Sequence, residues 1–368
     1  MIYLDNAATS FPKPRQVVHE VVNCIEKYCG NPGRSSHKLS LAALDKIFEV
    51  REAISDFLDN DRCENVVFTP NATFALNLVI KGLITKKCHC IISDLEHNSV
   101  IRPLKKRLKE VGGELSVFDT DLPLCDAILP LIRDDTEIVI CTLCSNVTGK
   151  FVNLSEISEI ARKRNLKLVL DASQYVGHSP LKLSGVYYTA LCTAGHKNLF
   201  GIQGSGFAII NDCKLFDTLI EGGSGVDTFS ADMPKLLPER YEAGTLSTPA
   251  IASVGAGINY INEVSVEAIE KKLIYLTKLL EYELRSIPTV EIYGANNGIV
   301  SFNMSDYTSS YVSSILDKHG IATRGGFHCA PIIHQKLGTE DRGAVRVSLS
   351  YFNTEKEIYT LSKILRKI

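Results

Sequence analysis

The sequence predicts an α/β protein in which a mostly parallel sheet lies between helices, with a smaller α+β part towards the C-terminal end. The middle of the chain alternates short apolar runs with helical patterns, which is typical of a parallel sheet covered on both faces. The last third changes to one long helix followed by short strands, and 368 residues are too many for one compact core. We therefore expect a large domain of residues 16–255 and a small domain of residues 1–15 and 256–368.

The elements follow from two kinds of apolar pattern. Short apolar runs predict strands at Asn65–Thr69, His89–Ser93, Glu114–Phe118, Glu137–Cys141, Leu166–Leu170, Ala190–Thr193, Val290–Tyr293, Gly298–Asn303 and Ala344–Ser348. Spacings of three and four residues predict helices over Val17–Tyr28, Leu41–Leu58, Thr73–Leu83, Val100–Val111, Leu122–Ile132, Ser155–Arg164 and Val266–Leu284. A capping box at Thr354–Glu357 opens a last helix.

Composition and charge narrow the class of partner. The chain is 45% hydrophobic with a net charge of −2, which gives no electrostatic case for nucleic acid or an anionic membrane as a partner. The first residues lack a signal-peptide pattern and no apolar run is long enough to span a bilayer, so we expect a cytoplasmic protein. The eleven cysteines are then expected to be reduced. Two close cysteine pairs, Cys88/Cys90 and Cys141/Cys144, favour buried thiols over a metal site, because neither has a second pair nearby.

Three candidate site residues follow predicted strands, where an open α/β sheet binds its ligands. Thr73 begins a helix and is a candidate phosphate ligand, although a plain N-cap is the better interpretation of that segment alone. Asp171 follows a buried strand, where it either pairs with a protonated pyridine nitrogen or caps the next turn. Lys197 follows the next strand, where desolvation favours a neutral amine that forms a Schiff base, although most such lysines are solvated.

Together these residues carry a resemblance to a known family. Asp171-Ala172-Ser173-Gln174 and Ala194-Gly195-His196-Lys197 resemble the class V aminotransferase superfamily, of pyridoxal 5'-phosphate fold type I. The resemblance is strongest to the cysteine desulfurase and selenocysteine lyase family and runs nearly end to end. It extends over Tyr3–Thr9, Asn31–Ser40, Glu96-His97, Ser145–Gly149, Glu242–Thr245 and Arg324–Pro331.

The resemblance implies roles for individual residues. Lys197 would carry the cofactor, Asp171 would pair with its pyridine nitrogen, and Gln174 would bind its phenolic oxygen. His97 would stack on the ring and shuttle protons as a catalytic residue, and Thr73 and His196 would hold the phosphate. Asn146 would lie near the ring and the substrate, and Thr245 would reach in from the second subunit of a homodimer. Without the family, His97 would be interpreted as a helix-start histidine that bonds local backbone.

The chain also departs from the family pattern. Ala194 stands where the family has a phosphate-binding Ser or Thr, and Thr193 points to the opposite face of its strand. Ala72 similarly replaces a Thr, so we expect fewer hydroxyl donors to the phosphate. Gly33 stands where the family typically has a His, so Arg34 and His37 are the polar residues that match the family in that segment. The Gln that usually follows the position of Ala330 is missing. The loop that carries Cys329 is short and has His328 before the Cys, which resembles the group II branch, so the departures make the chain similar to a divergent member of that branch.

A second constellation suggests sulfur chemistry. Arg324 and Arg346 are candidates for binding an α-carboxylate bidentately. Cys329 follows His328 in a Gly-rich loop, and a positive environment raises the thiolate fraction of such a cysteine, whereas the alternative is a buried inert thiol. The resemblance implies a cysteine desulfurase that converts L-cysteine to L-alanine, leaves a persulfide on Cys329, and passes the sulfur to a protein or small thiol. Selenocysteine lyase, another class V reaction (aminotransferase, epimerase or β-lyase) and a non-catalytic binding protein are the alternatives.

Overall fold

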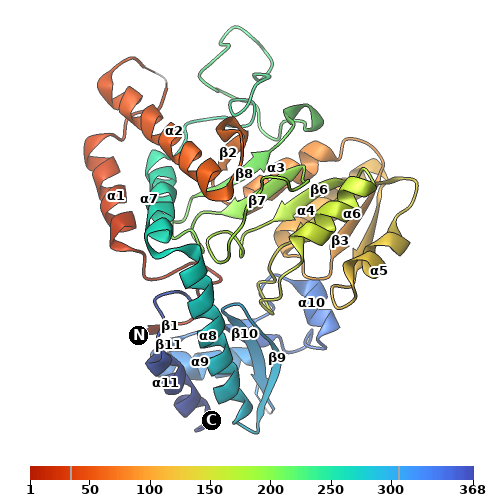
Figure 1. The fold of residues 1–368 in the computed structure, drawn as a ribbon, viewed down its shortest axis with the longest axis vertical. Helices are drawn as coiled ribbons and strands as arrows, with labels where there is room; N and C mark the ends of the chain where they lie inside the picture. The colour runs from red at the N-terminus through yellow and green to blue at the C-terminus, as the bar shows by residue number, and fades with distance from the viewer. Residues whose placement is uncertain (34, 306) are drawn as a thin grey trace.

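A mixed seven-stranded sheet organises the larger part of the protein (Figure 1). The computed structural model describes residues 1–33, 35–305 and 307–368. The strand order is β2-β8-β7-β6-β5-β3-β4, and β8 alone in this order runs antiparallel to its neighbours. The strands are β2 (Val66–Thr69), β3 (His89–Ser93), β4 (Glu114–Phe118), β5 (Thr136–Thr142), β6 (Lys167–Asp171), β7 (Ala190–Ala194) and β8 (Gly206–Ile210). The mostly parallel sheet expected from the sequence is confirmed.

Helices cover both faces of this sheet. Along β3, Ile91 packs in one hydrophobic cluster while Cys90 and Ile92 pack in another, because successive side chains of a strand point to opposite faces. One cluster is closed by α3 and α4, the other by α2, α5 and α6. The helices of this part are α1 (Arg15–Lys27), α2 (Lys38–Leu58), α3 (Ala72–Leu83), α4 (Asn98–Val111), α5 (Leu124–Ile128), α6 (Leu154–Lys163) and α7 (Thr248–Val264). Short 3₁₀ turns lie at Cys63–Asn65, Leu129–Leu131 and Cys213–Leu215.

Two helical expectations need correction. The helix expected over Leu122–Ile132 is wrong: α5 is a single short helix followed by a 3₁₀ turn. Pro123 caps α5 and Pro130 starts the turn, and a proline cannot donate the backbone hydrogen bond of a continuous helix. The helix α7 had no prediction, since it is buried on nearly every side and therefore lacks an amphipathic pattern. Residue 255, the expected domain boundary, lies inside α7, and the division into domains stays a prediction.

The smaller part contains a four-stranded antiparallel sheet in the order β12-β13-β10-β9. Its elements are α8 (Val266–Arg285), β9 (Val290–Asn296), β10 (Ile299–Met304), α9 (Ser309–Lys318), β11 (Ile321–Ala322), β12 (Arg324–Gly326), α10 (Pro331–Lys336), β13 (Ala344–Ser348) and α11 (Glu355–Leu365). The predicted capping box at Thr354 and Glu357 is confirmed. The strand β1 (Ile2–Tyr3) pairs with β11, so the N-terminal segment lies beside this part (Figure 1).

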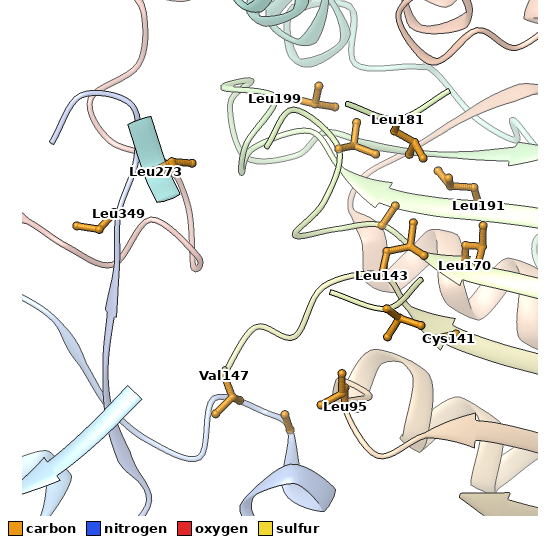
Figure 2. Packing of buried hydrophobic residues seen from close by; sticks show 14 of the residues in the cluster. Leu95, Cys141, Leu143, Val147, Leu170, Leu181, Leu191, Leu199, Leu273 and Leu349 are labelled. Carbon is orange, nitrogen blue, oxygen red and sulfur yellow. The ribbon is translucent and has the colours of Figure 1, made fainter. Parts of the chain in front are cut away.

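The interior confirms the expectation of buried thiols. Cys141 lies in register with Leu170 on the neighbouring strand, and Figure 2 shows it among the leucine side chains of the core. The Sγ atoms of Cys88 and Cys90 lie 3.9 Å apart, and both residues are buried. In the described part of the chain, no cluster of three or more potential metal ligands is found. Among the helices that the structure describes, none has the length and apolarity needed to cross a bilayer.

Candidate active site

The carboxyl ends of β5, β6 and β7 and the first turns of α3 and α4 surround a cavity of about 230 Å³. Most of the predicted site residues line it: Thr73, His97, Asn146, Asp171, Gln174, His196, Lys197, Arg324 and Arg346. The wall also includes Ala7 and Ala8 of the N-terminal segment and His328 of the small part. Segments from both ends of the chain therefore build one site.

Lys197 reaches the cavity from a tight turn after β7. A Cβ atom on Gly195 would lie only 2.4 Å from Ser205 Oγ and 2.7 Å from Val254 Cγ2, so the turn requires glycine there. Desolvation lowers the pKa of Lys197 to about 8, although the nearby Asp171 carboxylate opposes the shift. Near neutral pH the amine is therefore neutral more often than a solvated lysine, which is the form that attacks a carbonyl.

Asp171 ends β6 and is 4% exposed. Its Oδ1 accepts a hydrogen bond of 2.9 Å from the backbone N–H of Ser173, so it caps the turn, as one interpretation predicted. It also lines the cavity, so the two interpretations are compatible. Gln174 follows at the same edge and donates from Nε2 to the carbonyl oxygen of Ala7 at 2.8 Å, which joins the N-terminal segment to the cavity wall.

The helix start at α3 corrects the interpretation of Thr73. The N-cap is Asn71, whose side chain accepts from the backbone N–H of Phe74 at 2.9 Å, so the N-cap interpretation of Thr73 is wrong. The Thr73 hydroxyl instead lies in the cavity wall, 2.8 Å from Ser99 Oγ. A hydroxyl in the first turn of a helix suits an anion, because the helix dipole and free N–H groups point towards it.

The cavity wall holds hydroxyls beyond those that the sequence analysis assigned. Ala194 lines the cavity, whereas the Thr193 hydroxyl donates to the Ala172 carbonyl oxygen at 3.3 Å and so does not replace it. Ser99 and Ser173 also line the cavity, and sequence reasoning gave neither a role. Ser173 lies inside a motif that carries the resemblance, which is the signal that could have identified it. Ser99 has no such signal, because its place depends on the start of α4.

His97 combines two predicted roles. It is the N-cap of α4, and its Nδ1 accepts from the backbone N–H of Ser99 at 3.0 Å. The proton of the neutral ring therefore lies on Nε2. Desolvation, and then the charge of Lys197, lowers the pKa of His97 to about 4. The ring lines the cavity as a neutral imidazole with a fixed tautomer.

Two arginines come together at the side of the small part. Arg346 of β13 is 1% exposed and lies in register with Arg324 of β12. Its guanidinium forms a 2.7 Å ion pair with Asp5, which sequence reasoning did not identify, and a 3.0 Å hydrogen bond to the Asn146 carbonyl oxygen. Paired cations beside a cavity are suited to a carboxylate.

Cys329 is exposed on the loop after β12 and does not line the cavity, whereas the preceding His328 does. Its carbonyl oxygen accepts from the backbone N–H of Asn98 at 2.7 Å. The carbonyl oxygen of His328 accepts from Asn146 Nδ2 at 2.8 Å. Asn146 thus fastens the loop beside the cavity, and Cys329 lies next to the site rather than in a buried core.

The structure does not bring Thr245 to this site. Thr245 lines a second cavity of about 320 Å³, together with Arg51 and Glu242, which form a buried ion pair of 3.0 Å. Arg34 lies outside the described residues. His37 caps α2 by accepting from the backbone N–H of Ser40 at 3.2 Å. Within one protomer, therefore, Thr245 and His37 do not join the cavity around Lys197.

The unpaired polar atoms test whether the cavity fits pyridoxal 5'-phosphate. In the part that the structure describes, Ser173 Oγ, His196 Nδ1 and Arg346 Nε are buried without a hydrogen-bond partner, and all three residues line the cavity. Buried polar atoms normally have partners, so a ligand with oxygen atoms is the expected complement. The phosphate and phenolic oxygens of the cofactor and the carboxylate oxygens of a substrate would supply such partners. The protein adds an amine at Lys197 and a carboxylate at Asp171 in the same cavity. The residues fit the cofactor.

Glu96, which precedes His97, gives a prediction about stability. It is fully buried, its Oε1 accepts from Ser93 and from the Thr142 backbone, and desolvation raises its pKa to about 8. The unfolded chain releases this proton near pH 4.3 and the folded chain only near pH 8, so folding stability falls with pH between them, by up to about 1.4 kcal/mol per unit. Glu96→Gln should remove this dependence. Urea unfolding of both proteins across this range should show the variant gaining relative stability as pH rises; parallel curves would contradict the prediction.

Known proteins resemble this chain over its whole length. The aminotransferase class-V family matches residues 2–361. A probable cysteine desulfurase of Methanothermobacter thermautotrophicus is 32% identical, with all of this chain and 94% of that protein covered. A solved apo cysteine desulfurase of Thermococcus onnurineus superposes with a TM-score of 0.92 at 30% identity, over 100% of this chain and 94% of that one. A cysteine desulfurase of Escherichia coli shares the fold, with a TM-score of 0.90 at 23% identity over 99% and 94% of the two chains. The chain therefore belongs to the aminotransferase class-V family.

Proposed function

We propose that this protein is a pyridoxal 5'-phosphate-dependent cysteine desulfurase. Enzymes of the class-V family use this cofactor, and the relatives with the same length and fold are named cysteine desulfurases. The observation that carries the proposal is the position of Cys329. An exposed thiol is fastened by two backbone carbonyl contacts beside a cavity that holds an amine, a buried carboxylate and paired arginines. Transamination or epimerisation requires no such thiol.

The chemistry divides among the residues of the cavity. The bound cofactor would supply an electron sink for the bond changes at the substrate Cα and Cβ atoms. Lys197 would hold the cofactor and, as a neutral amine, would take the Cα proton. Asp171 would pair with the pyridine nitrogen and keep it protonated, and His97, with its proton on Nε2, would lie against the ring. The hydroxyls of Thr73 and Ser99 and the imidazole of His196 would hold the phosphate.

The sulfur transfer balances without an external oxidant. The Cys329 thiolate attacks the substrate sulfur, a new S–S bond forms, and the Cβ–S bond breaks. The electron pair of the broken bond stays with the carbon, which takes up protons and leaves as L-alanine. Cys329 is left as a persulfide, and a protein thiol or a small thiol removes the outer sulfur. Arg346 and Arg324 would hold the α-carboxylate during these steps.

The proposal includes a homodimer that works in the cytoplasm. Thr245 would then belong to the neighbouring subunit's phosphate site, which is consistent with its place in the wall of a different cavity of its own protomer. Exposed apolar side chains around the second cavity, Leu44, Phe48 and Val226, are suited to burial against a second copy. The free thiols of the chain are consistent with a reducing compartment.

Incubation of the holoenzyme with L-cysteine and a thiol reductant tests the function. We expect equal amounts of alanine and sulfide, and with L-selenocysteine alanine and selenide. Turnover on the two substrates, compared at equal concentration, decides between the desulfurase and the selenocysteine lyase. Pyruvate and ammonia in place of alanine would identify a β-lyase, and a keto acid with an aminated cofactor would identify an aminotransferase.

A further inference from the structure

Two buried imidazoles support the turn that carries Cys329. His328 is 3% exposed and His334 is 1% exposed. Nδ1 of His328 lies 3.3 Å from Nε2 of His334. The other nitrogen of each ring also has a contact: His328 Nε2 lies 3.2 Å from the Arg324 carbonyl oxygen, and His334 Nδ1 lies 2.7 Å from Thr339 Oγ1. Hydrogen bonds join Arg324, His328, His334 and Thr339 in one line, the imidazole line, which runs from β12 to the segment after α10.

The protons on this line can be placed from the chemistry of its ends. The Arg324 carbonyl oxygen only accepts, so His328 must carry a proton on Nε2. A neutral His328 then accepts at Nδ1, and Nε2 of His334 must donate to it. Nδ1 of His334 is left to accept from the Thr339 hydroxyl, whose other contact, to the His334 carbonyl oxygen, is longer at 3.3 Å. All contacts are satisfied when both rings are neutral with the proton on Nε2.

The surroundings favour these neutral forms. Desolvation and the charge of Arg346 lower the pKa of His328, and desolvation lowers the pKa of His334. The rings stack with centroids 5.5 Å apart, and Phe327 packs edge-on against His334 at 5.7 Å. A second proton on His328 would lie on Nδ1 and face the proton on His334 Nε2, so that two donors would meet at the contact between the rings.

The turn itself requires such support. His328 has a φ of 49° and Cys329 a φ of 57°, so two successive residues other than glycine adopt the left-handed conformation. This conformation costs free energy and persists only where the surroundings fix it. Asn98 and Asn146 hold the two carbonyl oxygens from the side of the large part. The imidazole line holds the same turn from the side of the small part, through the His328 side chain.

We propose that His334 is a positioning residue for the proposed nucleophile: through His328 it fixes the left-handed turn that presents Cys329 beside the cavity. The inference rests on the proposed role of Cys329. It adds the requirement that sulfur transfer needs a hydrogen-bond donor at the position of His334 Nε2.

Two substitutions of His334 separate positioning from folding. His334→Leu removes the donor, while His334→Gln retains an N–H group close to the position of Nε2. Each holoenzyme is assayed for alanine formation from L-cysteine and for exchange of the Cα hydrogen of L-alanine in deuterium oxide. The exchange needs the cofactor and Lys197 but not Cys329, so it reports the rest of the site.

We expect His334→Leu to lower kcat for alanine formation by about 10- to 100-fold with little change in KM or in exchange, and His334→Gln to restore most of the rate. Nitrogen-15 NMR of the histidine-labelled wild type should show both rings neutral and protonated on Nε2. A full rate in His334→Leu, an equal loss of exchange and desulfuration, or a proton on His328 Nδ1 would each overturn the inference. Failure of the proposed function would differ, because the wild type itself would then form no alanine while the NMR spectrum still reported the ring tautomers.

Discussion

Replacing Lys197 with Ala should abolish covalent attachment of the cofactor and lower kcat with L-cysteine by about three orders of magnitude or more. In the proposed function this residue supplies both functions from one position: its amine would hold the cofactor and take the Cα proton. Desolvation, which lowers the pKa of Lys197 to about 8, makes this amine available near neutral pH. Borohydride reduction followed by mass spectrometry measures the attachment, and alanine release measures the rate.

The matched control is Lys182→Ala, which removes an exposed loop lysine that does not line the cavity. This variant should retain the attachment, the rate and the unfolding midpoint of the wild type. A Lys197→Ala protein that still carried a reducible cofactor linkage would show that another amine holds the cofactor. Loss of attachment in the control would point to a general effect of removing lysines.

Replacing Cys329 with Ala should lower alanine and sulfide formation by about three orders of magnitude or more, because no other group is proposed to accept the substrate sulfur. Cofactor binding and exchange of the alanine Cα hydrogen should remain, since both depend on Lys197 and the cavity. In single turnover without a thiol acceptor, the wild type should gain the mass of one sulfur atom on the peptide containing Cys329, and the variant should not.

Cys125→Ala is the control, because Cys125 is also an exposed free thiol. It should behave as the wild type in all three assays. Alanine formation at the wild-type rate by Cys329→Ala would remove the desulfurase proposal and leave a cofactor-dependent reaction that needs no thiol. Sulfur found on Cys125 instead would show that Cys125, and not Cys329, is the nucleophile.

The strands of the central sheet were predictable because each is a short apolar run between turn residues. His89–Ser93 and Glu114–Phe118 agree with the structure residue for residue. The helix α7 was not predictable by periodicity, because its surroundings are apolar on nearly every side. Leu122–Ile132 shows the opposite case: an apolar pattern was present, but two prolines broke the helix.

The site was predictable where one local motif carries the chemistry, as at Asp171 and Lys197. It was less predictable where a role depends on partners from distant segments. Asp5 is recognised as a site residue only by its ion pair with Arg346, and His334 only by its contact with His328. Ser99 matters because it lies in the first turn of α4, which His97 caps, with its hydroxyl beside that of Thr73. Sequence spacing does not report such contacts.

The N-terminal segment has a consequence for the order in which the enzyme is made. Asp5 bonds Arg346 across 341 positions of the chain, and the His196 carbonyl oxygen accepts from Thr9, Ser10 and Lys13. Asp5 must therefore wait for β13, the last strand that the structure describes, before it finds its partner. A nascent chain can form the central sheet early, but it acquires a complete cofactor pocket only after β13 has been translated.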